Sequence, residues 1–155
     1  MPIFKPDEFL LNILPKKRLL GIDHGTKTLG IAISNSDMTV ASPIKTIKRD
    51  KLKSDLSKLI SIFDEYDITG LVMGWPLNMN GTVGPRCDSV RDFTNSVLKN
   101  RDIPVLLQDE RMSTMAVEKP MIIADISRKQ RSLRTDQLAA CWILQTALDV
   151  LNKKM

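Results

Sequence analysis

The stretch Leu19–Ser34, with the sequence LLGIDHGTKTLGIAIS, predicts two strands joined by a tight turn. It begins with a short apolar run typical of a buried central strand. Asp23 ends this run, and an ionised carboxylate there is costly to bury unless a cation or a basic partner compensates its charge. Gly25 and Gly30 permit the turn and the close approach of a ligand to the backbone. The stretch therefore predicts a strand pair that presents one carboxylate to a ligand, although an ordinary turn aspartate would give the same pattern.

The apolar periodicity of the rest of the chain predicts an α/β fold. Strands are expected over residues 18–23, 28–34, 40–48, 68–74 and 104–108, and helices over 50–66, 85–100 and 135–151. A helical stretch from Ser113 is expected to break near Pro120, and a basic connector spans 127–134. This order predicts one mixed five-stranded sheet, with its first three strands antiparallel, flanked by helices. Residues 18–155 are expected to form this domain, and residues 1–17 an N-terminal extension that docks on its surface.

Composition limits the function classes that need to be considered. A chain of 155 residues suffices for one domain with a sizeable core. The net charge of +5 and the pI of about 9.3 favour a polyanionic partner such as nucleic acid. Cys87 and Cys141 lack a CxxC or histidine companion, which argues against zinc or a disulfide framework and is typical of reduced thiols in a cytoplasmic protein. The sequence holds no apolar run near the length of a membrane span and no signal-peptide core, so no membrane partner is expected.

Two further acidic positions follow the pattern of Asp23. Asp109 and Glu110 come where the strand 104–108 ends, and Asp136 lies in the first turn of the last helix, on the face of its small apolar residues. The carboxyl ends of parallel strands meet at one edge of an open sheet, where ligands bind. Adjacent strand residues point to opposite faces, so only one of Asp109 and Glu110 is expected to reach the centre. The pattern predicts a site for Mg²⁺ or Mn²⁺, which prefer carboxylate oxygens, although helix capping would also account for Asp109 and Asp136.

Basic residues flank the acidic positions and are the candidate nucleic-acid contacts. Some of them lie beside one acidic position, one begins a helix, and the others cluster just before Asp136. They are Lys27, Arg86, Arg111, Arg128, Lys129, Arg131 and Arg134. Contacts of such side chains with phosphates would weaken as salt rises. A solvated surface is the alternative interpretation of each of them.

Four segments together resemble the YqgF/RuvX family, whose members are described as Holliday-junction-resolvase-like proteins and as pre-16S rRNA nucleases. The segments are GIDHGTKTLGIA at 21–32, GWPLNMNGTVGPR at 74–86, DERMST at 109–114, and DQLAA at 136–140 with ILQ at 143–145. The resemblance covers residues 18–151. It implies an RNase H-like fold and a metal-dependent nuclease whose site holds Asp23, the acid of the Asp-Glu-Arg motif and Asp136. It also implies final processing of the 5′ end of 16S rRNA in the bacterial cytoplasm.

Two residues depart from the family pattern, and two alternative functions also fit the sequence. His24 stands where the family often has proline or an apolar residue, and Pro120 falls in a helix that usually lacks it. A Holliday junction resolvase, which should be a dimer because it cuts two strands symmetrically, is the first alternative. A non-catalytic nucleic-acid-binding protein of the same fold is the second. The expected partner is structured RNA or branched DNA, and the chain is expected to be a monomer or a homodimer.

Overall fold

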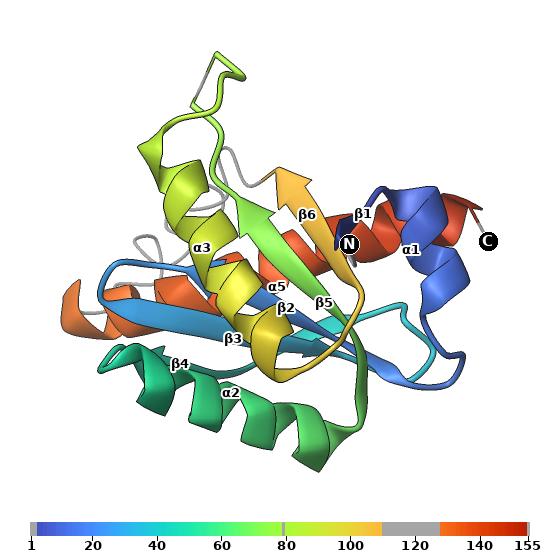
Figure 1. Ribbon diagram of the computed structural model, residues 1–155, viewed down its shortest axis with the longest axis horizontal. Helices are drawn as coiled ribbons and strands as arrows, with labels where there is room; N and C mark the ends of the chain where they lie inside the picture. Colours follow the sequence, from blue (N-terminus) through green and yellow to red (C-terminus); the bar gives the residue numbers. More distant parts are fainter. Residues whose placement is uncertain (1–2, 79, 110–127, 155) are drawn as a thin grey trace.

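The computed structural model describes residues 3–78, 80–109 and 128–154, with the side chains of the last range from residue 137 onward (Figure 1). Six strands form one mixed sheet in the order β1-β6-β5-β2-β3-β4. Their bounds are β1 Ile3–Phe4, β2 Arg18–His24, β3 Thr28–Ser34, β4 Ala41–Lys48, β5 Ile68–Trp75 and β6 Val105–Asp109. The pairs β2–β3 and β3–β4 are antiparallel, whereas β1, β6, β5 and β2 run parallel. The predicted mixed α/β sheet, with its antiparallel strands 18–23, 28–34 and 40–48, is therefore confirmed.

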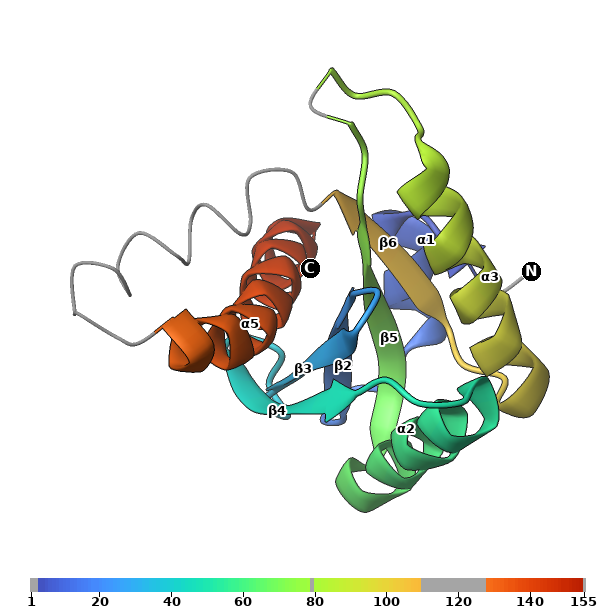
Figure 2. The same cartoon turned by 90° about the vertical axis from the view of Figure 1, so that its left-hand side faces the viewer.

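Four described helices flank this sheet. They are α1 Pro6–Asn12, α2 Leu52–Tyr66, α3 Pro85–Asn100 and α5 Arg128–Lys154. Helices α2 and α3 cover one face, and α5 crosses the other (Figure 2). The apolar spacing of α2 and the proline in the first turn of α3 explain why both helices begin within two residues of their predicted starts.

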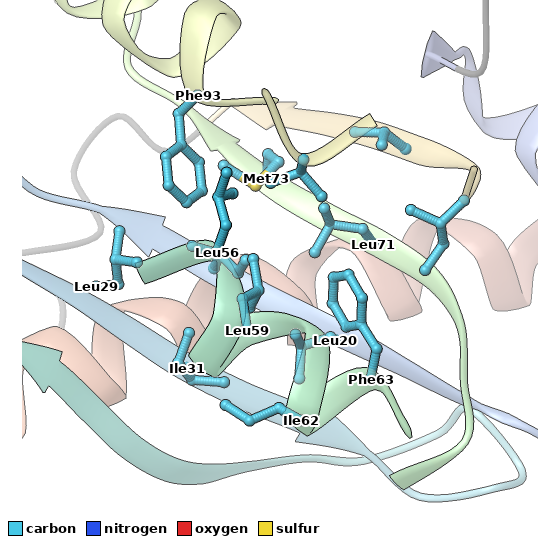
Figure 3. Packing of buried hydrophobic residues seen from close by; sticks show 14 of the residues in the cluster. Leu20, Leu29, Ile31, Leu56, Leu59, Ile62, Phe63, Leu71, Met73 and Phe93 are labelled. Carbon is cyan, nitrogen blue, oxygen red and sulfur yellow. The ribbon is translucent and has the colours of Figure 1, made fainter. Parts of the chain in front are cut away.

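Two apolar clusters fill the space on either side of the sheet. The α2/α3-side cluster joins strand residues such as Leu20, Ile22 and Met73 to Phe63 of α2 and Phe93 of α3 (Figure 3). The α5-side cluster is made by Phe9, Leu19, Ala32, Met38, Val72, Leu106, Ala140, Ile143, Leu144, Ala147, Leu148 and Leu151. Strand residues alternate between the two clusters, which fixes the face on which every side chain of β2 and β6 lies.

The close approach of α5 to the sheet depends on Gly21. A Cβ atom at this position would lie 2.7 Å from the Cβ of Leu144 and 3.2 Å from the carbonyl oxygen of Ala140. A residue with a side chain would therefore push the helix away from β2. The small residues of α5 and Gly21 together bring the helix to the face that carries Asp23.

The structure differs from the sequence-based expectation in three places. The sheet has six strands instead of five, because Ile3–Phe4 pairs with Val105 and Leu106 of β6. Phe9 of α1 is fully buried in the α5-side cluster, so this helix contributes to the core. The expected basic connector is helical from Arg128, because this run contains neither glycine nor proline and consists mostly of good helix formers. The expected helix from Ser113 with its break at Pro120 lies outside the described residues.

Candidate active site

Asp23 lies near the carboxyl end of β2 and faces α5. Its neighbour Ile22 belongs to the α2/α3-side cluster, and Leu19 belongs to the α5-side cluster. Alternation along the strand therefore puts Leu19, Gly21 and Asp23 on the α5 face. Asp23 is half-buried.

Asp109 ends β6 at the same end of the sheet, with β5 between it and β2. The β5–β6 ladder pairs Gly74 with Gln108 and Trp75 with Asp109. Leu106 packs in the α5-side cluster and Leu107 packs against the α2/α3-side cluster. Alternation then puts Gln108 on the face of Asp23, and Asp109 on the opposite face.

Gly74 separates Asp23 from β6 on the α5 face. The β2–β5 ladder pairs Ile22 with Met73, so Gly74 is level with Asp23. A glycine inside a strand often marks the place where a ligand or another backbone comes close. At this level the α5 face therefore presents the carboxylate of Asp23, the bare backbone of Gly74 and the amide of Gln108.

The structure describes the other two predicted acidic residues only in part or not at all. Asp136 belongs to α5, one turn before Ala140, whose carbonyl approaches Gly21. The side chain of Asp136 and the whole of Glu110 are not among the described parts of the chain. Within the described part, no group of three or more His, Cys, Asp or Glu side chains could hold a metal ion.

His24 lies on the face opposite to Asp23, in a different environment. It is buried, 4% exposed, and its ring centroid is 4.9 Å from that of Phe93. Its Nε2 is 3.1 Å from Nη1 of Arg49; a guanidinium only donates, so Nε2 accepts and the proton resides on Nδ1. Burial, with the nearby charges of Arg49 and Arg86, lowers the pKa of His24 to about 4. His24 is therefore a neutral, buried residue of β2.

The predicted basic contacts have several different positions. Lys27 is exposed in the turn between β2 and β3. Arg86, in the first turn of α3, donates a hydrogen bond from Nη2 to the carbonyl oxygen of His24 at 2.6 Å. Four basic residues lie in the first two turns of α5, and their side chains are outside the described part of the chain. They are Arg128, Lys129, Arg131 and Arg134. Arg111 also lies outside the described residues.

Arg49 is the residue near the site that sequence reasoning missed. Its Nη1 donates to the carbonyl oxygen of Gly25 at 3.0 Å, and its Nε lies 3.5 Å from Oδ2 of the fully buried Asp55. It also lies over the ring of Phe93, 5.5 Å from the centroid. Gly25, Asp55 and Phe93 come from three different segments, and no local pattern around Arg49 predicts these contacts.

Comparisons with known proteins show the family of this chain. The family model RuvX, described as Holliday junction resolvase, matches residues 17–150. A protein of Paramagnetospirillum magneticum named as a candidate pre-16S rRNA nuclease is 44% identical over 149 residues, covering 96% of this chain and 96% of that protein. A protein of the same name from Rhodospirillum rubrum is 43% identical over 155 residues, covering 99% and 96%. The chain belongs to the RuvX family. The resemblance noted from the four sequence segments is thus confirmed.

Solved structures support the fold class of this RuvX family member. The Thermus thermophilus RuvC chain, solved with a Holliday junction substrate, superposes with a TM-score of 0.57 at 13% identity, covering 88% of this chain and 96% of that one. The fowlpox virus resolvase, solved with Holliday junction DNA, gives a TM-score of 0.53 at 12% identity, covering 86% and 98%. At such low identity these likenesses concern the fold alone, and they confirm the predicted RNase H-like architecture. No helix in the described part of the chain is long and apolar enough to cross a membrane.

Proposed function

We propose that this chain is a metal-dependent nuclease that hydrolyses phosphodiester bonds at the α5 face of the sheet. The observation that carries the proposal is the place of Asp23. It is the residue before the last one of the central strand β2, level with the bare backbone of Gly74 and on the face that α5 approaches. A half-buried carboxylate in such a place suits the binding of a hard cation.

The proposed site joins Asp23, Glu110 and Asp136. Asp109 is on the opposite face of the sheet from Asp23. We therefore assign the role of the Asp-Glu-Arg acid to Glu110. Asp136 is the third member because it precedes Ala140 by one turn on the helix that packs on Gly21.

Carboxylate oxygens without a competing Cys/His set fit Mg²⁺ or Mn²⁺. When bound, such an ion activates a water molecule and offsets the charge that develops on the phosphate. Asp23, Glu110 and Asp136 would hold it. Lys27 and the basic residues that begin α5 would hold the backbone phosphates of the nucleic acid around the scissile bond.

The proposed substrate is structured RNA, with maturation of the 5′ end of pre-16S rRNA as the role. Support comes from the names of relatives at 43–44% identity over nearly the whole chain. A cytoplasmic location follows from this role, with the chain as a monomer or a homodimer. Resolution of four-way DNA junctions is the second candidate, favoured by the description of the matching family model.

The test is cleavage of two labelled substrates, a pre-16S rRNA 5′ fragment and a DNA four-way junction, with Mg²⁺, with Mn²⁺ or with EDTA. We expect metal-dependent cleavage of the RNA that Asp136→Asn abolishes. Cleavage of the junction alone would replace rRNA maturation by junction resolution. Binding of both substrates without cleavage of either would contradict the nuclease and leave a non-catalytic binding protein.

A further inference from the structure

Asp23 lies next to the last residue of β2, just after the last pair of the ladder with β5. The parallel ladder with β5 reaches the pair Ile22 and Met73, whereas the antiparallel ladder with β3 continues to His24 and Leu29. The end of the strand therefore extends beyond the ladder that it shares with β5. Contacts made beyond this ladder therefore help to hold the strand end in place.

Two guanidinium groups bind the backbone of this strand end. Arg86 donates from Nη2 to the carbonyl oxygen of His24 at 2.6 Å. Arg49 donates from Nη1 to the carbonyl oxygen of Gly25 at 3.0 Å and contacts the ring nitrogen of His24 at 3.1 Å. Hydrogen bonds from a charged donor are shorter and stronger than neutral ones. The two guanidinium groups thus bind His24 and Gly25, the two residues that follow Asp23.

Arg49 is itself held from three directions. Its ion pair with Asp55 links it to α2, and its place over Phe93 links it to α3. Its backbone N–H donates to the carbonyl oxygen of Lys27 at 2.8 Å, in the turn after β2. Asp55 is fully buried and also accepts the N–H of Asp50 at 3.0 Å, so the carboxylate that anchors Arg49 is fixed.

Arg86 is placed by the loop that leads into α3. Pro85 occupies the first turn of that helix, and Gly84 caps it, with its carbonyl accepting the N–H of Cys87 at 3.0 Å. Asn78 closes the preceding loop by accepting the N–H of Gly81 and by donating to the carbonyl oxygen of Thr82. The guanidinium of Arg86 thus reaches His24 from a fixed helix start.

We propose that Arg49 and Arg86 are positioning residues that clamp the carboxyl end of β2 and thereby hold Asp23 in place. The inference rests on the proposed nuclease function of Asp23. A catalytic constellation must be held to within about 0.5 Å by its supporting contacts. Loss of the clamp should therefore lower kcat more than it changes KM. A phosphate contact by Arg86 would instead be lost as a rise in KM and a weaker salt dependence.

The experiment compares Arg86→Gln, Arg86→Lys and Arg49→Lys with the control Arg101→Gln, which removes an exposed ion pair with Asp64. Amide hydrogen exchange is measured over residues 23–28, and kcat and KM are measured on the labelled RNA. We expect exchange to rise at least about 10-fold in Arg86→Gln and Arg49→Lys. We also expect kcat to fall about 10- to 100-fold with KM changed less than about 3-fold, and Arg86→Lys to recover part of the loss.

Unchanged exchange over residues 23–28 in both Arg86→Gln and Arg49→Lys would overturn the clamp. A rise in KM with kcat unchanged would overturn it for Arg86 and make that residue a substrate contact. Should the unsubstituted protein cut neither RNA nor a DNA junction, the nuclease proposal fails, and exchange then decides the clamp alone. Arg49→Lys keeps a cation near the buried Asp55, so the variant retains a partner for that carboxylate.

Discussion

At the scale of single residues, two neighbours on β2 have opposite surroundings. Asp23 is half-buried on the α5 face, and His24 is buried against Phe93 and Arg49 on the other face. Sequence alone shows their adjacency, and strand alternation separates them. A proton shuttle from His24 to a group bound at Asp23 is therefore not supported by the geometry.

The lowered pKa of His24 predicts a pH-dependent stability. The folded value of about 4 is below the ordinary 6.5, so as pH falls the unfolded chain binds the proton first. The contribution of the neutral imidazole to the free energy of unfolding is fully present above about pH 6.5. It is lost as pH falls toward 4, by about 2 kcal/mol at pH 5. Urea unfolding of the unsubstituted protein and His24→Gln at about pH 7 and pH 5 measures it. An equal pH effect in both proteins would contradict the burial of a neutral imidazole.

The choice between Asp109 and Glu110 is also decided at the residue scale. Because Asp109 faces away from Asp23, we expect Asp109→Asn to lower kcat less than about 10-fold and Glu110→Gln to lower it at least about 100-fold. Single-turnover cleavage of the RNA measures both. A larger loss in Asp109→Asn than in Glu110→Gln would reverse the assignment.

At the scale of elements, the distance between α5 and β2 depends on Gly21. In Gly21→Ala the new methyl would meet Leu144 at 2.7 Å, so we expect the free energy of unfolding to fall by about 1–3 kcal/mol and cleavage to weaken as α5 shifts. Urea unfolding and single-turnover cleavage of the RNA measure the two effects. Unchanged stability and cleavage in Gly21→Ala would show that the position of α5 does not depend on this close approach.

Helix α1 is the second element whose role is testable. Phe9 is fully buried, whereas Leu11 of the same helix is 85% exposed. We expect Phe9→Ala to lower the free energy of unfolding by about 3–5 kcal/mol and Leu11→Ala to change it by less than about 0.5 kcal/mol. Urea unfolding measures both. Similar small effects would mean that α1 does not belong to the core.

How far sequence predicts these elements depends on the range of their contacts. The strands and helices with a clear apolar period, such as β2, β5 and α3, lie within one or two residues of their predicted bounds. A strand as short as Ile3–Phe4 has no period to detect and exists because β6 offers a parallel partner. The role of Arg49 was not predicted because its partners come from β2, α2 and α3 and not from its own local sequence.

At the scale of the whole molecule, the fold gathers its parallel strand ends on one edge, with a basic helix start and an exposed lysine turn near the same edge. A net charge of +5 adds a general attraction for nucleic acid. The central claim is that Asp23 holds a divalent cation at this edge for phosphodiester hydrolysis.

The direct test is Mn²⁺ binding, titrated by electron paramagnetic resonance, together with Mn²⁺-supported RNA cleavage. Asp23→Asn is compared with the control Asp37→Asn, an exposed acid in the turn between β3 and β4. The account predicts that Asp23→Asn loses at least about 10-fold in Mn²⁺ affinity and at least about 100-fold in cleavage, while Asp37→Asn matches the unsubstituted protein. Mn²⁺ binding and cleavage that persist unchanged in Asp23→Asn would contradict it.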